Sequence, residues 1–172
     1  MVMSPPVRRF ALSVHLTCSI GWVGAVIAYI GLGTAAVLSD SPATVRSAWV
    51  AMELIGWYVL VPLALGSWLT GLVMSLGTRW GLFRYYWVLF AFVLTTLATT
   101  VLLMHMPDVS SVADAVQIAD PGDLDRYGGD LFHAVLALVL LLLIQVLNLY
   151  KPPGMTPYGW RKNNRERRTR TT

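Results

Sequence analysis

The sequence is short of charged residues. Only 13% of its 172 residues are Asp, Glu, Lys or Arg, whereas a soluble domain carries about 25%. A chain with so little charge cannot cover a surface that faces water on all sides, so its composition excludes an ordinary soluble domain. The charges that are present also cluster, and four stretches contain none: 10–39, 54–78, 85–107 and 131–150.

These charge-free stretches are 30, 25, 23 and 20 residues long. A helix needs about 20 apolar residues to span the hydrocarbon core, and a segment in lipid must satisfy its backbone hydrogen bonds internally. The sequence therefore predicts an all-α integral membrane protein. The first stretch is about twice as long as the apolar core of a signal peptide, so we expect it to remain in the membrane. The four helices are expected at about 10–38, 50–77, 84–106 and 130–150, within one transmembrane domain that covers 1–172.

Cysteine and catalytic motifs are also scarce. Cys18 is the only cysteine, so the chain can form no internal disulfide. The sequence contains no phosphate-binding glycine loop, no serine elbow and no zinc-finger spacing. It therefore predicts no catalytic residue, and we do not expect an enzyme.

The basic residues are distributed unevenly between the two ends of the predicted helices. The termini and the turn after the second helix hold 11 Lys and Arg, whereas the two opposite loops hold only Arg46 and Arg126. Basic residues are retained on the cytoplasmic side, so both termini are predicted to be cytoplasmic. The 11 residues are Arg8, Arg9, Arg79, Arg84, Lys151, Arg161, Lys162, Arg165, Arg167, Arg168 and Arg170.

The connections favour an up-down-up-down four-helix bundle, because two of the three loops are short. The third loop contains "SVADAVQIAD", which places Val112, Ala113, Val116 and Ala119 on one side. This pattern predicts a short amphipathic helix on the outer leaflet. The tail 151–172 is basic, and its position beside a span favours binding to anionic lipid headgroups over binding to nucleic acid.

Small residues recur along one side of the first helix, at Cys18, Gly21, Ala25 and Ala28. Small residues allow close helix–helix approach in a membrane. This strip predicts contact with another helix, which could belong to the same chain, to a second copy or to a different membrane protein.

Three histidines are the candidate ligands. His105 lies within "LLMHMPD", but successive helical residues point about 100° apart, so Met104 and Met106 cannot join it around one ion on a regular helix. His105 and His133 are expected at similar depth, at the outer ends of neighbouring helices. Two imidazoles at one level could hold haem iron, or copper with a methionine sulfur; alternatively, each bonds a carbonyl or a headgroup.

His15 lies alone near the inner side of the first helix, six residues after Arg9. Met74 lies five residues before Arg79 and is expected at a comparable depth. Histidine with methionine is a known axial pair for haem, although methionine in a membrane helix also serves as packing. His15 and Met74 are therefore a second candidate pair of cofactor ligands, besides His105 and His133.

Two sets of segments resemble known families. "HLTCSIGWVG" is similar to the first helix of the membrane domain of copper-resistance protein D and of HemJ-type protoporphyrinogen oxidases. The resemblance to the HemJ-type enzymes implies that His15 is a haem ligand, and Met74 falls near the position where the partner ligand would lie. "GTRWGLFRYYWVLFAFVLTTLATTVLLMHMP" and "YKPPGMTPYGWR" resemble a family of uncharacterised four-helix bacterial integral membrane proteins, which implies a bacterial plasma membrane. Relatives tend to have lysine near Ala91, and this chain does not, so no catalytic role is transferred.

These observations lead to two main hypotheses. We interpret the chain as an accessory or structural membrane subunit that docks a partner or a second copy through its small-residue strips and its outer-leaflet helix. The alternative is a membrane redox protein that binds haem b or copper. Transport is a weaker third hypothesis, because four helices enclose little space and no pair of carboxylates lies within the spans.

Overall fold

A computed structural model describes residues 3–78, 80–128 and 130–168 of the chain. Across these ranges the protein is helical and has no β-strand apart from a single bridge between Tyr85 and Met155. The all-α prediction is therefore confirmed. The elements are α1 (Pro5–Leu38), α2 (Pro42–Ile55), the π-helical turn η1 (Gly56–Leu60), α3 (Val61–Gly77), α4 (Tyr86–Ile118), the 3-10 helix η2 (Pro121–Arg126), α5 (Leu131–Tyr150) and α6 (Pro157–Arg168).

Among the described residues, four helical rods are long and apolar enough to cross a membrane. The second rod consists of α2, η1 and α3, which follow one another without a break. The rods are 34, 36, 33 and 20 residues long in chain order. At a rise of 1.5 Å per residue, the first three measure about 50 Å and α5 about 30 Å. The hydrocarbon core is about 30 Å thick, so three of the rods are longer than the membrane that they could cross.

The extra length corrects two of the predicted boundaries. The first helix begins at Pro5 rather than near 10, and the second rod begins at Pro42 rather than near 50. The predicted helix limits were placed at the nearest charged residues. A charged residue marks where the chain leaves the lipid, but the helix can continue beyond that point. Proline favours the first helical turn because its missing N–H has no partner there, and both rods begin with one.

The prediction of a separate amphipathic helix in the outer loop is wrong. Residues 108–118 continue α4 through Pro107, and the chain leaves the helix only at Ala119. The predicted apolar side is correct, but it packs on protein instead of lipid: α4 lies against α2, and Ala113 and Val116 are fully buried. This packing explains why the helix continues past a proline that would otherwise favour an end.

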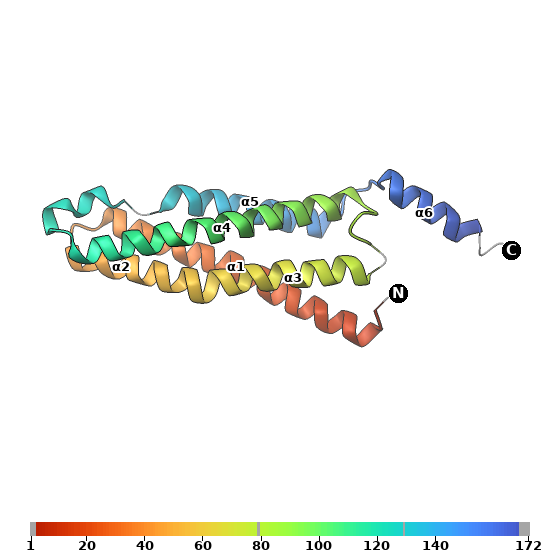
Figure 1. Cartoon of the computed structure of the whole chain (residues 1–172), viewed down its shortest axis with the longest axis horizontal. Coiled ribbons are helices and arrows are strands. Elements are labelled where there is room, and N and C mark those ends of the chain that lie inside the picture. The colour runs from red at the N-terminus through yellow and green to blue at the C-terminus, as the bar shows by residue number, and fades with distance from the viewer. Residues whose placement is uncertain (1–2, 79, 129, 169–172) are drawn as a thin grey trace.

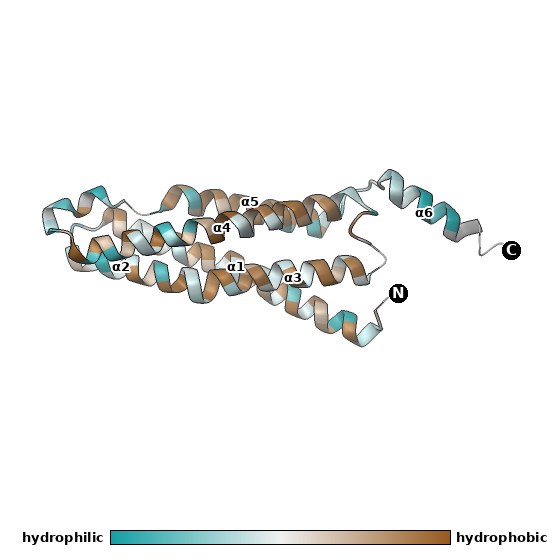
Figure 2. Ribbon diagram, viewed as in Figure 1, coloured by the Kyte–Doolittle hydropathy of each residue, from teal (hydrophilic) through white to brown (hydrophobic). Residues whose placement is uncertain are grey.

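The four rods surround a common core. α1 packs against α2, α3 and α5, while α4 contacts the same three helices from the other side. Figure 1 shows both termini at one end of the molecule and the α4–η2–α5 connection at the opposite end. Hydrophobic residues dominate the middle of the rods, and polar residues gather towards the ends and on α6 (Figure 2).

The small-residue strip of α1 is used largely inside the chain. A methyl group at Gly21 would come within 3.3 Å of the Leu63 side chain, and the Cys18 side chain lies against Gly66. Both partners belong to α3. The predicted close helix–helix contact is therefore present between α1 and α3, and Ala28 is the member of the strip that remains exposed.

The chain after α5 is fastened to the turn before α4. The Thr156 amide donates to the Arg84 carbonyl at 3.0 Å, and the Tyr86 amide donates to the Gly154 carbonyl at 3.2 Å. The Thr156 hydroxyl also accepts the Gly159 amide at 3.0 Å, which caps the first turn of α6. We call residues 154–159, with this turn, the tail anchor. Beyond it, α6 projects away from the bundle (Figure 1).

Gly159 makes the tail anchor sensitive to a single methyl group. A Cβ at this position would overlap the carbonyl oxygen of Arg84, and backbone atoms cannot rotate away as a flexible side chain does. We expect Gly159→Ala to separate α6 from the turn, at a cost of about 1–3 kcal/mol for the overpacking. Hydrogen–deuterium exchange should become at least tenfold faster at the amides of Tyr86 and Thr156.

Gly122→Ala is the matched control, since nothing lies within 4 Å of a Cβ built there. It should leave exchange in the tail anchor unchanged. Wild-type protection of the two amides in the Gly159→Ala variant would show that the described contact does not hold the tail.

Candidate metal centre

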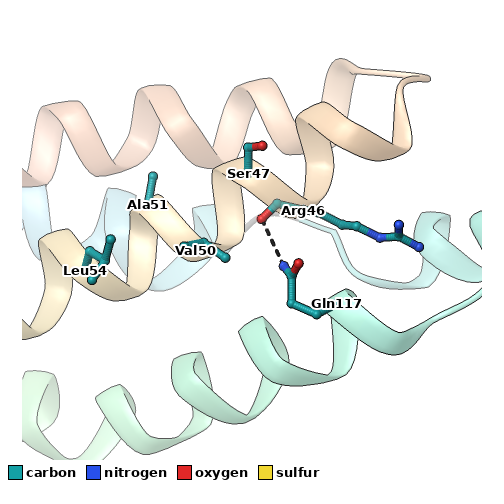
Figure 3. A pocket seen from close by; sticks show the side chains of 6 residues that line it. All are labelled: Arg46, Ser47, Val50, Ala51, Leu54 and Gln117. Carbon is teal, nitrogen blue, oxygen red and sulfur yellow. Dashed lines mark hydrogen bonds between the residues drawn. The ribbon is translucent and has the colours of Figure 1, made fainter.

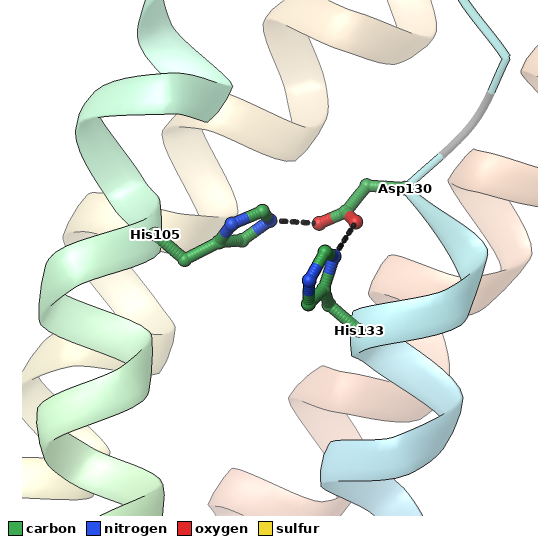
Figure 4. Close-up of side chains that lie close together, drawn as sticks. All are labelled: His105, Asp130 and His133. Atoms are coloured by element: carbon green, nitrogen blue, oxygen red, sulfur yellow. Dashed lines mark hydrogen bonds and ion pairs between the residues drawn. The ribbon is translucent and has the colours of Figure 1, made fainter.

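Three side chains of the types that can bind a metal ion meet where α4 and α5 approach each other, at the end of the bundle opposite the termini (Figure 4). His105 Nε2 lies 2.5 Å from Oδ2 of Asp130, and His133 Nδ1 lies 3.0 Å from Oδ1 of the same carboxylate. The centroids of the two imidazole rings are 4.4 Å apart. One carboxylate thus bridges two histidines from different helices.

The local structure explains how these groups come together. Asp130 directly precedes α5, and His133 is the third residue of that helix. Residues three apart on a helix lie on the same side, so His133 reaches back to the carboxylate. Asp130 makes no hydrogen bond that caps α5, because its two oxygens face the histidines. His105 comes from α4, which packs directly against α5.

Tyr29 supports the carboxylate from a third helix. Its hydroxyl donates to Oδ2 of Asp130 at 3.3 Å, and only 4% of the residue is exposed. α1 can pass this close because Gly33, one turn later, lies directly against Leu131 and the Asp130 amide. A hydrogen bond to a ligating carboxylate orients the ligand in metal sites. Tyr29 therefore occupies the place of an outer-shell partner.

The donor set suits a borderline divalent transition-metal ion. One donor atom from each residue lies within 4.8 Å of the others, and bonds of about 2.0–2.2 Å from a shared ion to nitrogen and oxygen require donors at roughly 3–4 Å from one another. Two imidazoles and a carboxylate carry a charge of about −1, which opposes that of the cation. Three protein ligands would leave a fourth position for water.

Neither of the two methionines that flank His105 joins the cluster. The end of the Met106 side chain lies against Gly56, and Met104 is 74% exposed on the outside of α4. The "MHM" sequence thus sends its three side chains in different directions. Without a sulfur ligand, the site favours Zn²⁺ or Cu²⁺ over Cu⁺.

The geometry does not support haem between His105 and His133. With metal–imidazole bonds of about 2 Å, a porphyrin between two axial histidines would hold the ring centroids roughly 6 Å apart. The observed separation is 4.4 Å, with the ring planes inclined by 37°. A single ion fits this spacing, whereas a porphyrin does not.

The sequence indicated the two histidines but missed the groups that join them. Asp130 lies three residues before His133 in the sequence, and this i,i+3 spacing is a local signal that could have identified it. Tyr29 had no such signal, because it lies 101 residues from Asp130 in the chain. Its contact depends on how α1 packs beside α5.

The second predicted pair, His15 and Met74, is arranged differently. His15 lies against α3, where its Nδ1 is 3.0 Å from the Thr70 hydroxyl. Met74 lies one helical turn beyond Thr70 on the same helix. His/Met haem ligation therefore stays a prediction without geometric support, and the cavity beside His15 has a volume of only about 30 Å³, far below the 300–1,000 Å³ typical of ligand pockets.

A larger groove of about 280 Å³ lies between α2 and α4 (Figure 3). Its one cation, Arg46, donates to the carbonyls of Val116 and Ala119 at 3.2 and 2.7 Å, and Gln117 donates back to the Arg46 carbonyl at 3.3 Å. These bonds satisfy carbonyls at the C-terminal end of α4. Arg46 therefore has a structural role, and the groove offers no cluster of metal-binding or nucleophilic groups.

Comparison of the chain with protein-family models, with curated proteins and with solved structures found no match. No family is therefore assigned. The resemblances of short segments remain expectations, and the case for a function depends on the geometry of the site.

Proposed function

We propose that this protein is an integral membrane protein that binds one divalent transition-metal ion through His105, Asp130 and His133. The observation that carries the proposal is the carboxylate that lies within hydrogen-bond distance of two imidazoles from separate helices. In this proposal, the ion takes the place of the hydrogen bonds between the two imidazoles and the Asp130 carboxylate. The Tyr29 hydroxyl keeps that carboxylate in position. Zn²⁺ and Cu²⁺ are the ions whose preferred ligands match the site best.

The exposure of the ligands supports entry of the ion from water. The His133 side chain is 53% exposed, that of His105 24% and that of Asp130 12%. The site also lies beside the boundary between the charge-free stretch of α4 and its charged extension, which begins at Asp108. An ion from the aqueous phase at this end would meet His133 first and then the more buried pair.

The experiment is metal binding by the purified full-length chain in detergent. After treatment with a chelator, the protein should bind one equivalent of Zn²⁺ with a dissociation constant in the micromolar range or tighter by calorimetry. Co²⁺ should give the visible absorption of a nitrogen- and oxygen-ligated site. A folded protein that binds neither Zn²⁺ nor Cu²⁺ at 100-fold molar excess would refute the proposal.

We also propose that both termini are cytoplasmic, which places the metal centre on the outer side of a bacterial plasma membrane. The support is the basic residues at the termini end, and the sequence resemblances support the bacterial location. The exposed Arg161, Lys162 and Arg165 of α6 then lie beside anionic headgroups of the inner leaflet. In a Cys18→Ala background, a single cysteine at Gly122 should react with an impermeant thiol reagent in intact cells, whereas a single cysteine at Ser4 should react only after the membrane is permeabilised.

A second candidate function, an accessory subunit that docks another helix, is favoured by one observation. Gly24, Ala28, Gly31 and Ala35 lie along one side of α1 and are all exposed, and nothing lies within 4 Å of a Cβ built at Gly24 or Gly31. Such a face permits close helix packing in lipid. A cysteine at Gly31, again without Cys18, should form a crosslink in native membranes; its absence would count against this role.

A further inference from the structure

A second polar site lies inside the bundle, towards the end that carries the termini. It is the cavity of about 30 Å³ beside His15, and residues of α1, α3, α4 and α5 line it. Its wall includes five other hydrogen-bonding side chains besides the indole of Trp22: Ser19, Ser67, Thr95, Gln145 and Asn148. So many polar groups around one small space in an apolar bundle need hydrogen-bond partners.

Some of these groups have partners within the described chain and some do not. Ser19 and Ser67 share a hydrogen bond of 2.8 Å, and Thr95 donates to the carbonyl of Ala91. Gln145 and Asn148 are half-buried, and neither side chain makes a hydrogen bond to another described residue. Their amides therefore offer both donors and acceptors to the cavity.

The hydrogen bonds around Thr70 determine which nitrogen of His15 carries the proton. The Thr70 hydroxyl has one proton, and its oxygen lies 2.6 Å from the Gly66 carbonyl, to which it donates. The hydroxyl must then accept from Nδ1 of His15, 3.0 Å away. In the neutral ring, Nε2 is then left as the acceptor.

From these observations we propose that the cavity is a hydrated site that binds one or two water molecules between Nε2 of His15 and the amides of Gln145 and Asn148. The volume fits, because each water needs about 10–15 Å³ of this kind of space and two to four polar partners. Asn148 lies two residues before the end of α5, so the site is close to the aqueous phase at the termini end. His15 is the only titratable residue among those that line the cavity.

The bound water therefore provides a path by which Nε2 of His15 can exchange protons with the solvent. Water donates to the Nε2 lone pair, and the Gln145 and Asn148 amides orient that water towards the bundle end. This site is independent of the metal centre, because it lies at the other end of α5 and shares none of its residues.

The test is NMR of the full-length protein in lipid nanodiscs, with ¹⁵N-labelled histidine and glutamine. Assignment uses His15→Gln, which removes the His15 signals. The wild-type spectra should show His15 in the Nδ1–H tautomer and a water cross-peak to the Gln145 side-chain amide. A dry Gln145 amide, or a His15 ring in the Nε2–H tautomer at neutral pH, in the wild-type protein would overturn the proposal.

Two variants separate hydration of the cavity from general access of water. Gln145→Leu with Asn148→Leu removes the unpartnered amides and should abolish the water contact of the His15 ring. Leu142→Ala alters a half-exposed residue on the outside of the same helix and should retain it. Loss of the contact in both variants, or in neither, would refute the assigned role of the amides.

Discussion

Asp130→Asn is expected to lower the affinity for Zn²⁺ at least 100-fold. The substitution keeps the size of the side chain but removes its negative charge. It also replaces one of the two carboxylate oxygens, each of which faces one histidine, with an NH₂ group that cannot bind a metal ion. Loss of an outer-shell partner alone costs about 10–100-fold in metal affinity, so loss of a central ligand should cost at least as much as the upper limit. His105→Ala, which removes the less exposed imidazole, should have a similar effect. Calorimetric titration of each purified variant measures the change.

Tyr29→Phe provides a graded comparison at the same site. It removes only the hydroxyl that donates to Asp130 at 3.3 Å, so we expect an affinity loss of about 10-fold. Asp123→Asn is the control for charge, because Asp123 lies on η2, where it pairs with Arg126 at 3.4 Å. It should bind Zn²⁺ as the wild type does. If Asp130→Asn and Asp123→Asn had the same affinity, the ion would not be held by this cluster.

Trp49→Ala is expected to lower the free energy of unfolding by about 3–5 kcal/mol, the range for removal of a large buried aromatic side chain. Trp49 is 3% exposed and lies on the buried side of α2, with Val45, Ala48 and Met52. Its indole N–H also donates to the Tyr127 carbonyl at 3.4 Å. The substitution would leave a void between α2 and its neighbours and would release the segment that leads to Asp130.

Thermal or denaturant unfolding in detergent, followed by circular dichroism, measures this change. Trp49→Phe is the comparison, since it keeps most of the aromatic packing and loses the indole N–H; we expect a cost of about 1–2 kcal/mol. The Trp49→Ala variant should also bind Zn²⁺ more weakly, because Tyr127 lies three residues before Asp130. A loss of stability below 1 kcal/mol in Trp49→Ala would mean that this contact does not stabilise the fold.

The sequence predicts those parts of the fold that a single physical rule determines. Charge-free stretches in a charge-poor chain must be helices if they lie in lipid, and the four long apolar helices are present. The same rule gave wrong starts for the first two rods, since Pro5 and Pro42 lie in polar sequence. The same rule also predicted that α4 would end near Pro107. The helix continues because Ala113 and Val116 pack against α2, and a local sequence pattern does not reveal that contact.

The candidate site shows the same division between local and distant information. Position along two helices was enough to place His105 and His133 at one level. The spacing of Asp130 and His133 was local and could have been used. In contrast, the Tyr29 contact and the cavity beside His15 depend on several helices at once, so a single sequence gives no period or motif that predicts them.

If the protein binds an ion as proposed, the unequal lengths of the rods would make the proposed metal centre sensitive to bilayer thickness. α5 has 20 residues, about the minimum that crosses the hydrocarbon core, while the other three rods have length to spare. A thicker bilayer would draw the start of α5 below the headgroups, and both His133 and His105 with it, because the two rings lie only 4.4 Å apart. Lipids with long acyl chains would then bury the whole cluster at once, so acyl chain length would control how readily an ion enters.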